Sequence, residues 1–261
     1  MPMAFDSLDY TVTEGRAEVV LDRPDVLNAF DSEMIDELNT ALERAHEDDS
    51  VYVVLLTGAG RGFCSGADVS DMGGERDRTE STVRLFKVQN VVRKLYHGEK
   101  PTVAAVNGPA LGAGCDFALG CDLRVMGEEA FLREQFVNIG LVPGDGGAWL
   151  LPRLVGEAKA KELVMTGRDV GPEEAVDLGL AVESVPTDEV LEAGRELANT
   201  IRDKPGTAMQ ETKALFDDSA TYDDYAQAAI EAQRAARDDP EHTEAVTALR
   251  EGRDPDFDRS Y

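Results

Sequence analysis

Stretches of apolar residues, each closed by glycine, proline or charged residues, divide the first half of the chain into alternating strands and helices. The pattern predicts strands at residues 17–21, 51–57, 101–106 and 123–126. Residues 51–57, VYVVLLT, are almost all apolar, which is typical of a parallel strand covered on both faces. Helices are predicted from Asp31, as N-cap, to about His46, at residues 82–96, and from about Gly112. This alternation predicts an α/β fold with right-handed crossovers.

The second half of the chain has a different pattern, in which helices dominate. Helices are predicted near residues 158–166 and after Pro172, with one short strand at residues 181–185. Beyond Pro205 the sequence contains only helical patterns, which continue to about Gly252. We therefore expect a mixed α/β core over residues 1–204 and a helical C-terminal region over residues 205–261.

The charge of the chain narrows the range of its partners. The sequence has 52 Asp and Glu against 26 Lys and Arg, which gives a formal net charge of −26 at pH 7. A field of that sign repels nucleic acids and anionic membranes, so we expect neither as a partner. Only seven residues are lysine, and the acids are spread through every predicted helix. This pattern favours a surface that stays hydrated in concentrated salt, as in a halophile.

Two further features favour a cytoplasmic protein without a metal site. The first residues, MPMAFDSLDY, lack a basic segment followed by an apolar one, and no window approaches the roughly 18 apolar residues of a membrane span. The three cysteines, Cys64, Cys115 and Cys121, form neither an even set nor a metal-ligand spacing. We expect them to be small buried residues.

Two glycine-rich loops follow predicted strands, at the carboxyl ends where α/β sheets bind ligands. Residues 58–69, GAGRGFCSGADV, lack the Walker lysine spacing and the full dinucleotide fingerprint, so a simple tight turn is as good an interpretation as a binding site. Residues 107–116, NGPALGAGCD, open a helix whose free N–H groups suit an oxyanion. Asp116 in its first turn fits catalysis and, equally well, the preference of acids for helix N-termini.

These loops and several later segments, in the same order, resemble the crotonase (enoyl-CoA hydratase/isomerase) family. The matching segments are GFCSGADVSDM (62–72), AAVNGPALGAGCDFALGCDLRV (104–125), IGLVPGDGG (139–147), LPRLVG (151–156), LDRPDVLNAF (21–30) and TGRDVGPEEAVDLGLAVESV (166–185). The resemblance spans nearly the whole chain and is specific for the family, although not for one reaction. It implies a ClpP/crotonase-type spiral of ββα units with a C-terminal helical oligomerisation region.

The resemblance also implies where a coenzyme A thioester would bind. Its carbonyl oxygen would lie between the backbone N–H groups of Ala67 and Ala113, an oxyanion hole of the kind that stabilises an enolate. The second position is a glycine in the family, and alanine keeps the donor while narrowing the space. Positions that match the family's CoA and pantetheine path are Val26, Leu27, Ser65, Asp68 and Val69.

The match is weakest at the residues that transfer protons. Asp116 stands where hydratases of the family have one catalytic glutamate, and its side chain is one methylene shorter. Phe136 stands where they have the second, and phenylalanine carries no proton. Glu134 would share a face with Phe136 if this segment is a strand, and it is one substitute. Asp145 is another, since some family isomerases have aspartate one residue earlier in this loop, but a turn or N-cap role fits it equally well.

The resemblance implies an enzyme, and we expect an enoyl-CoA hydratase that acts on 2-enoyl-CoA thioesters. The alternatives are a double-bond isomerase of the same family, an acyl-CoA thioester hydrolase, and a family member that has lost its chemistry and binds a partner, RNA included. Net charge argues against RNA. We expect a homotrimer or homohexamer, and no cofactor other than the coenzyme A of the substrate.

Overall fold

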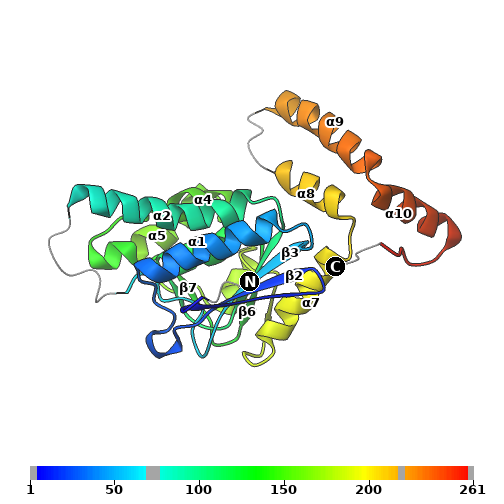
Figure 1. Cartoon of the computed structure of the whole chain (residues 1–261). Helices are drawn as coiled ribbons and strands as arrows, with labels where there is room; N and C mark the ends of the chain where they lie inside the picture. The colour runs from blue at the N-terminus through cyan, green and yellow to red at the C-terminus, as the bar shows by residue number, and fades with distance from the viewer. Residues whose placement is uncertain (1–4, 69–76, 217–220, 258–261) are drawn as a thin grey trace.

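The computed structural model describes residues 5–68, 77–216 and 221–257 (Figure 1). Its main sheet has six strands in the order β1-β2-β3-β4-β6-β8, and a second sheet pairs β5 with β7. The strands are β1 (Leu8–Thr13), β2 (Arg16–Leu21), β3 (Val53–Gly58), β4 (Thr102–Val106), β5 (Ala110–Leu111), β6 (Leu123–Gly127), β7 (Leu132–Arg133) and β8 (Glu183–Val185).

Helices connect and cover these strands. The α-helices are α1 (Ser32–Glu47), α2 (Arg78–His97), α3 (Ala113–Gly120), α4 (Gly147–Val155), α5 (Glu157–Thr166), α6 (Pro172–Asp177), α7 (Val190–Arg202), α8 (Gly206–Ala214), α9 (Tyr222–Asp238) and α10 (Pro240–Glu251). Two 3₁₀ helices, η1 (Pro24–Val26) and η3 (Gln135–Ile139), lie in the connecting loops.

The mixed α/β pattern predicted from the sequence is confirmed. All neighbours in the main sheet are parallel except β1 and β2, and β3 is buried at every position, as its unbroken apolar run predicts. Asp31 is the N-cap of α1 and accepts a hydrogen bond from the N–H of Met34 at 2.9 Å. The edge strand β1 has no such apolar run, because most of its residues are exposed.

Helices cover both faces of the main sheet (Figure 1). On one side, α1, α2 and α3 pack on the sheet around a large cluster of buried residues that includes Leu38, Leu56 and Phe117. On the other side, α7 packs on β3, β4 and β6 around Val53, Val103 and Ala198. Burial on both faces holds the parallel strands in place, so the loops at their carboxyl ends start from fixed positions.

The last three helices extend away from this core (Figure 1). Lys213 of α8 is joined to the core by an ion pair with Asp122 at 2.9 Å, whereas α9 and α10 each bury a single alanine, Ala232 and Ala248. Among the described residues, no helix combines the length and the apolar character needed to cross a membrane.

Candidate active site

The two glycine-rich loops lie side by side, because they leave the neighbouring strands β3 and β4 at the same edge of the sheet. Cys64 of the first loop pairs with Ala110 of the second, and the N–H of Leu111 donates to the carbonyl of Cys64 at 2.9 Å. Gly114 permits this approach: a Cβ there would collide with the Cys64 carbonyl oxygen and lie 2.8 Å from the Cys64 Cβ. The helix α3 therefore begins in direct contact with the first loop.

Two asparagines, which the sequence analysis did not single out, hold the first loop. Asn28 is fully buried in a left-handed conformation, and its Nδ2 donates to the carbonyls of Gly62 at 2.8 Å and Ala59 at 3.0 Å. Asn107 donates to the carbonyl of Gly58 at 2.8 Å from the second loop. Side-chain amides suit this role because they can replace the missing backbone partners of an irregular loop.

The predicted oxyanion donors, Ala67 and Ala113, lie on the facing parts of these loops. Ala67 bridges to Phe30, which donates to the Gly66 carbonyl and accepts from the Asp68 N–H, both at 2.9 Å. The N–H of Ala67 itself therefore points away from Phe30. Ala113 is the first residue of α3, so its N–H has no partner within the helix. A Cβ on Gly66 would lie 3.8 Å from the Ala113 nitrogen, so the residue before Ala67 lies close to the second donor.

The residues matched to the CoA path form one wall beside the first loop. The Ser65 N–H donates to the Leu27 carbonyl at 3.0 Å, and its Oγ donates to the Val26 carbonyl at 3.1 Å. Asp68 pairs with Arg23 at 3.3 Å. Val26 is exposed, as a ligand-facing position requires. Val69 lies outside the described residues.

Asp116 lies in the first turn of α3, beside Ala113, and none of its surface is exposed. Burial raises the pKa of its carboxyl well above the usual range, and the nearby carboxyl of Glu134 raises it further. The N–H of Gly147 partly offsets this by lowering the pKa. An ordinary acid at a helix N-terminus is exposed and ionised, so Asp116 does not fit the purely structural interpretation.

Glu134 lies next to Asp116. The segment after Glu134 is the 3₁₀ helix η3 and not a strand, so Glu134 does not share a strand face with Phe136. Its carboxyl packs on Gly147, where a Cβ would lie 2.5 Å from the Glu134 Cδ. Only 4% of the residue is exposed, and burial raises its pKa to about 7.

Asp145 is the third carboxyl of this cluster. Asp145 lies in the turn that precedes α4, as one of its two structural interpretations predicts, but it is not the N-cap, because Gly146 holds that position and no side chain caps the helix. Burial raises the pKa of Asp145 to about 6, and the positive charge of Arg84 on α2 lowers it in part. The same helix supports the loop, because Gln89 donates to the Gly144 carbonyl at 2.8 Å. The charge of Asp145 in turn raises the pKa values of Asp116 and Glu134.

Phe136, the position matched to the second glutamate of the family's hydratases, packs against the start of α3. It is 9% exposed, and its Cζ would lie 3.5 Å from a Cβ on Gly112, the residue before Ala113. The ring is therefore next to the predicted oxyanion donors. Three carboxyls, two backbone N–H groups and one aromatic ring meet at the N-terminus of α3.

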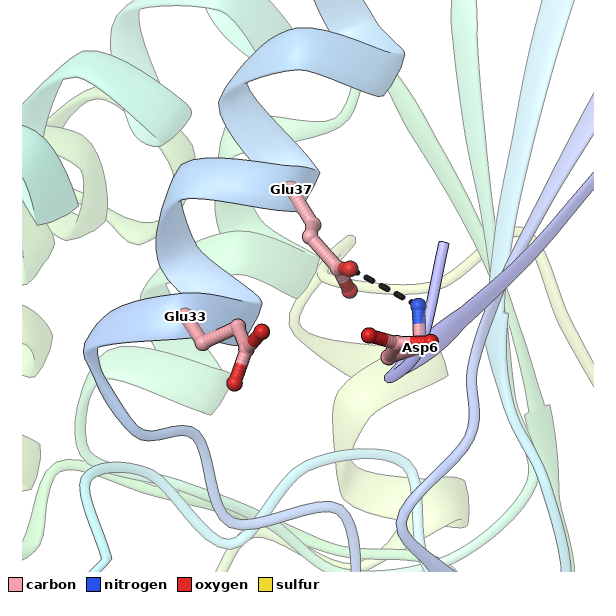
Figure 2. Close-up of side chains that lie close together, drawn as sticks. All are labelled: Asp6, Glu33 and Glu37. Atoms are coloured by element: carbon pink, nitrogen blue, oxygen red, sulfur yellow. Dashed lines mark hydrogen bonds between the residues drawn. The ribbon is translucent and has the colours of Figure 1, made fainter. Parts of the chain in front are cut away.

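Another group of carboxylates, far from this cluster along the chain, consists of Asp6, Glu33 and Glu37 (Figure 2). Glu37 accepts hydrogen bonds from the N–H groups of Asp6 at 2.7 Å and Ser7 at 2.9 Å. These bonds account for its position by tying the start of β1 to α1. Asp6 and Glu33 are exposed, as acids on this surface commonly are.

Comparison with known families identifies the group to which this arrangement belongs. The family model described as "Enoyl-CoA hydratase/isomerase" matches residues 11–260. The chain belongs to the enoyl-CoA hydratase/isomerase family. It is therefore an enzyme of this family, and the resemblance inferred from the glycine loops is confirmed.

The similar proteins in this family are named for more than one reaction. The chain is 34% identical over 253 residues to the 1,2-epoxyphenylacetyl-CoA isomerase of Escherichia coli, covering 94% of this chain and 96% of the relative. It is 37% identical over 204 residues to the short-chain-enoyl-CoA hydratase of Clostridium acetobutylicum, covering 77% of each. The crystal structure of an enoyl-CoA hydratase from Bacillus anthracis superposes with a TM-score of 0.93 at 28% identity, covering 98% of this chain and all of the other. The crotonase-type fold is thereby confirmed.

Proposed function

We propose that this enzyme is an enoyl-CoA hydratase that adds water across the double bond of 2-enoyl-CoA thioesters. The observation that carries the proposal is the meeting of two buried carboxyls, Asp116 and Glu134, with the half-buried Asp145 in one cluster beside Ala113. Replacement of an acid by Phe136 therefore does not leave Asp116 without a second carboxyl. Hydration needs one group that takes a proton from water and one that protonates the α-carbon.

The parts of the site divide this chemistry between them. The N–H groups of Ala67 and Ala113 hold the thioester oxygen and stabilise the enolate that forms when water adds to the β-carbon. Asp116 gives its proton to the α-carbon, and Asp145, whose pKa is about 6, accepts the proton from the attacking water. Val26, Leu27, Ser65, Asp68 and Val69 bind the pantetheine and CoA portion, and Phe136 contacts the acyl group. No other cofactor takes part.

A double-bond isomerase is the second candidate, and Phe136 is the observation that favours it. Its ring lies against Gly112, beside the donors, where it leaves less room for an attacking water. Migration of a double bond needs no water, because one carboxyl can remove a proton from one carbon and return it to another. The loop that carries Asp145 also resembles that of family isomerases.

Two substrates distinguish these reactions. The purified enzyme is incubated in high salt with crotonyl-CoA, and separately with a 3-enoyl-CoA. The absorbance of the conjugated thioester is followed, and the products are identified by mass spectrometry. We expect crotonyl-CoA to lose conjugation and gain the mass of one water. Gain of conjugation from the 3-enoyl ester without hydration of crotonyl-CoA would instead establish an isomerase. Repeating the assay at low salt tests the proposed halophilic adaptation, for which we expect lower activity.

We further propose that residues 205–261 form an oligomerisation region and that the enzyme is a cytoplasmic homotrimer or homohexamer. Helices α9 and α10 expose large apolar side chains: Tyr222 is 78%, Ile230 55% and Leu249 81% exposed. A cavity of about 1070 Å³ separates α8 and α10 from the ends of α1 and α2, and none of the three site carboxyls lines it. A second copy would cover such surfaces. A monomeric mass in light scattering would contradict this assignment.

A further inference from the structure

We propose that Asp116 and Glu134 hold one proton between them, and that Glu134 is a positioning residue that keeps Asp116 protonated at neutral pH. The inference deepens the proposed function, because it rests on Asp116 as the proton donor. The shared proton itself can be measured without any turnover, so the two proposals can fail separately.

Both carboxyls approach the same residue, which fixes them side by side. Gly147 begins α4 and is buried. The carboxyl of Glu134 lies against its Cα, and its N–H lies next to the carboxyl of Asp116. A side chain at this position would displace Glu134. Glu134 and Asp116 lie close enough to form a hydrogen bond with each other when one of them is protonated.

Few donors around the pair could hold both carboxyls ionised: the N–H of Gly147 lowers the pKa of Asp116, and the Cys115 thiol lowers that of Glu134. Within the described part of the chain, none of the four carboxyl oxygens of Asp116 and Glu134 accepts a hydrogen bond of good geometry. A cavity behind Glu134 has a volume of about 10 Å³, which is the lower limit for a single water. Two adjacent ionised carboxylates with few donors and little room for water are strongly unfavourable, whereas one shared proton removes a charge and supplies a hydrogen bond between them.

The groups around the pair have opposing effects. The Cys115 thiol on α3 lies next to Glu134 and lowers its pKa, whereas the negative charge of Asp145 raises the pKa values of both Asp116 and Glu134. Arg84 on α2 acts on Asp145. Arg168 lines the small cavity with Glu134, but its guanidinium pairs with Glu162 and Glu174. No cation among these residues is therefore directed at the pair to hold both carboxyls ionised.

Asp116 is the more completely buried member of the pair, with none of its surface exposed against 4% of Glu134, and it lies beside the oxyanion donors. We therefore place the proton on Asp116 and the negative charge on Glu134. During turnover the O–H bond of Asp116 breaks as the C–H bond at the α-carbon forms, and the proton that water leaves on Asp145 returns to the pair afterwards. An isolated aspartate is ionised at neutral pH and could not donate.

The proton is observed directly by carbon-13 NMR of the wild-type enzyme with labelled Asp and Glu carboxyls, titrated from pH 5 to 9. We expect one carboxyl of the pair to remain protonated at pH 7, and Glu134→Gln to assign the signals. Two carboxyls that are both ionised at pH 7 would overturn the proposal. The protonation state is read from the wild-type enzyme and does not depend on activity.

The kinetic test uses Glu134→Gln against Glu128→Gln, a matched change at an exposed glutamate. Removal of the neighbouring negative charge lowers the pKa of Asp116, so the alkaline limb of the kcat/KM profile should move to lower pH by about one unit. At pH values above this limb, the kcat/KM of Glu134→Gln relative to that of the wild type should be about tenfold lower. Glu134→Asp should recover part of the shift. An unmoved profile in Glu134→Gln, with a lower rate at every pH, would reduce Glu134 to a packing role.

Discussion

Substitution of Asp116 by Asn is expected to lower kcat by about 10²–10⁴-fold while the affinity for a CoA thioester stays nearly unchanged. The amide keeps the shape of the buried side chain but has no proton that it can donate and recover. The groups that bind CoA and the two backbone donors are left in place, so KM should change little. Steady-state kinetics and calorimetric titration of a non-reactive acyl-CoA analogue measure the two effects separately.

The same substitution should make the protein more stable at neutral pH. Burial raises the folded-state pKa of Asp116 well above its usual range, so the folded state retains a proton that the unfolded chain releases. Stability is therefore lost as pH rises from below 4 toward the folded pKa, and Asn does not titrate. The melting temperature of Asp116→Asn should exceed that of the wild type by an amount that grows with pH.

Asp177→Asn, at an exposed position, is the control for Asp116→Asn, and we expect no change in kinetics or melting temperature. Full activity of Asp116→Asn would return Asp116 to a structural role. Reduced stability at pH 8 would mean that the carboxylate is the favoured form in the folded protein.

The second large effect is expected from Gly114→Ala. A Cβ at this position collides with the carbonyl oxygen of Cys64, so the start of α3 must move away from the first loop. That movement separates the N–H of Ala113 from the N–H of Ala67, and loss of one oxyanion donor costs about 10²–10³-fold in kcat. Overpacking should also destabilise the fold by about 1–3 kcal/mol. Kinetics are measured well below the melting temperature, which circular dichroism defines for each variant.

Gly120→Ala provides the control for the collision, because it lies at the other end of α3 and an added Cβ meets only ordinary contacts at 3.5 Å. We expect nearly wild-type kcat from it. A Gly114→Ala enzyme that is folded and equally active would show that the relative position of the two loops does not set the rate.

Much of the core could be predicted from the sequence because its strands are buried on both faces. The strands β2, β3, β4 and β6 are marked by apolar runs, and α1 is marked by Asp31 at its start. The edge strand β1 was missed, since a strand that is mostly exposed has no such signal. The two loops could be located because segments that approach each other closely through their backbones are rich in glycine.

The arrangement of the acids was decided by tertiary structure. The sequence by itself determined the mixed α/β core and the position of the two loops, since each depends on residue type and short-range spacing, and Asp116 was proposed as the first acid from the family resemblance. It could not determine the partner of Asp116, because Glu134, just before a 3₁₀ helix, packs against Gly147, which lies 13 positions further on. The roles of Asn28 and Asn107 could not be predicted either, because no periodic pattern in the sequence marks a residue that holds a loop. Burial and mutual repulsion, which set the pKa values of these acids, arise only when distant segments pack together.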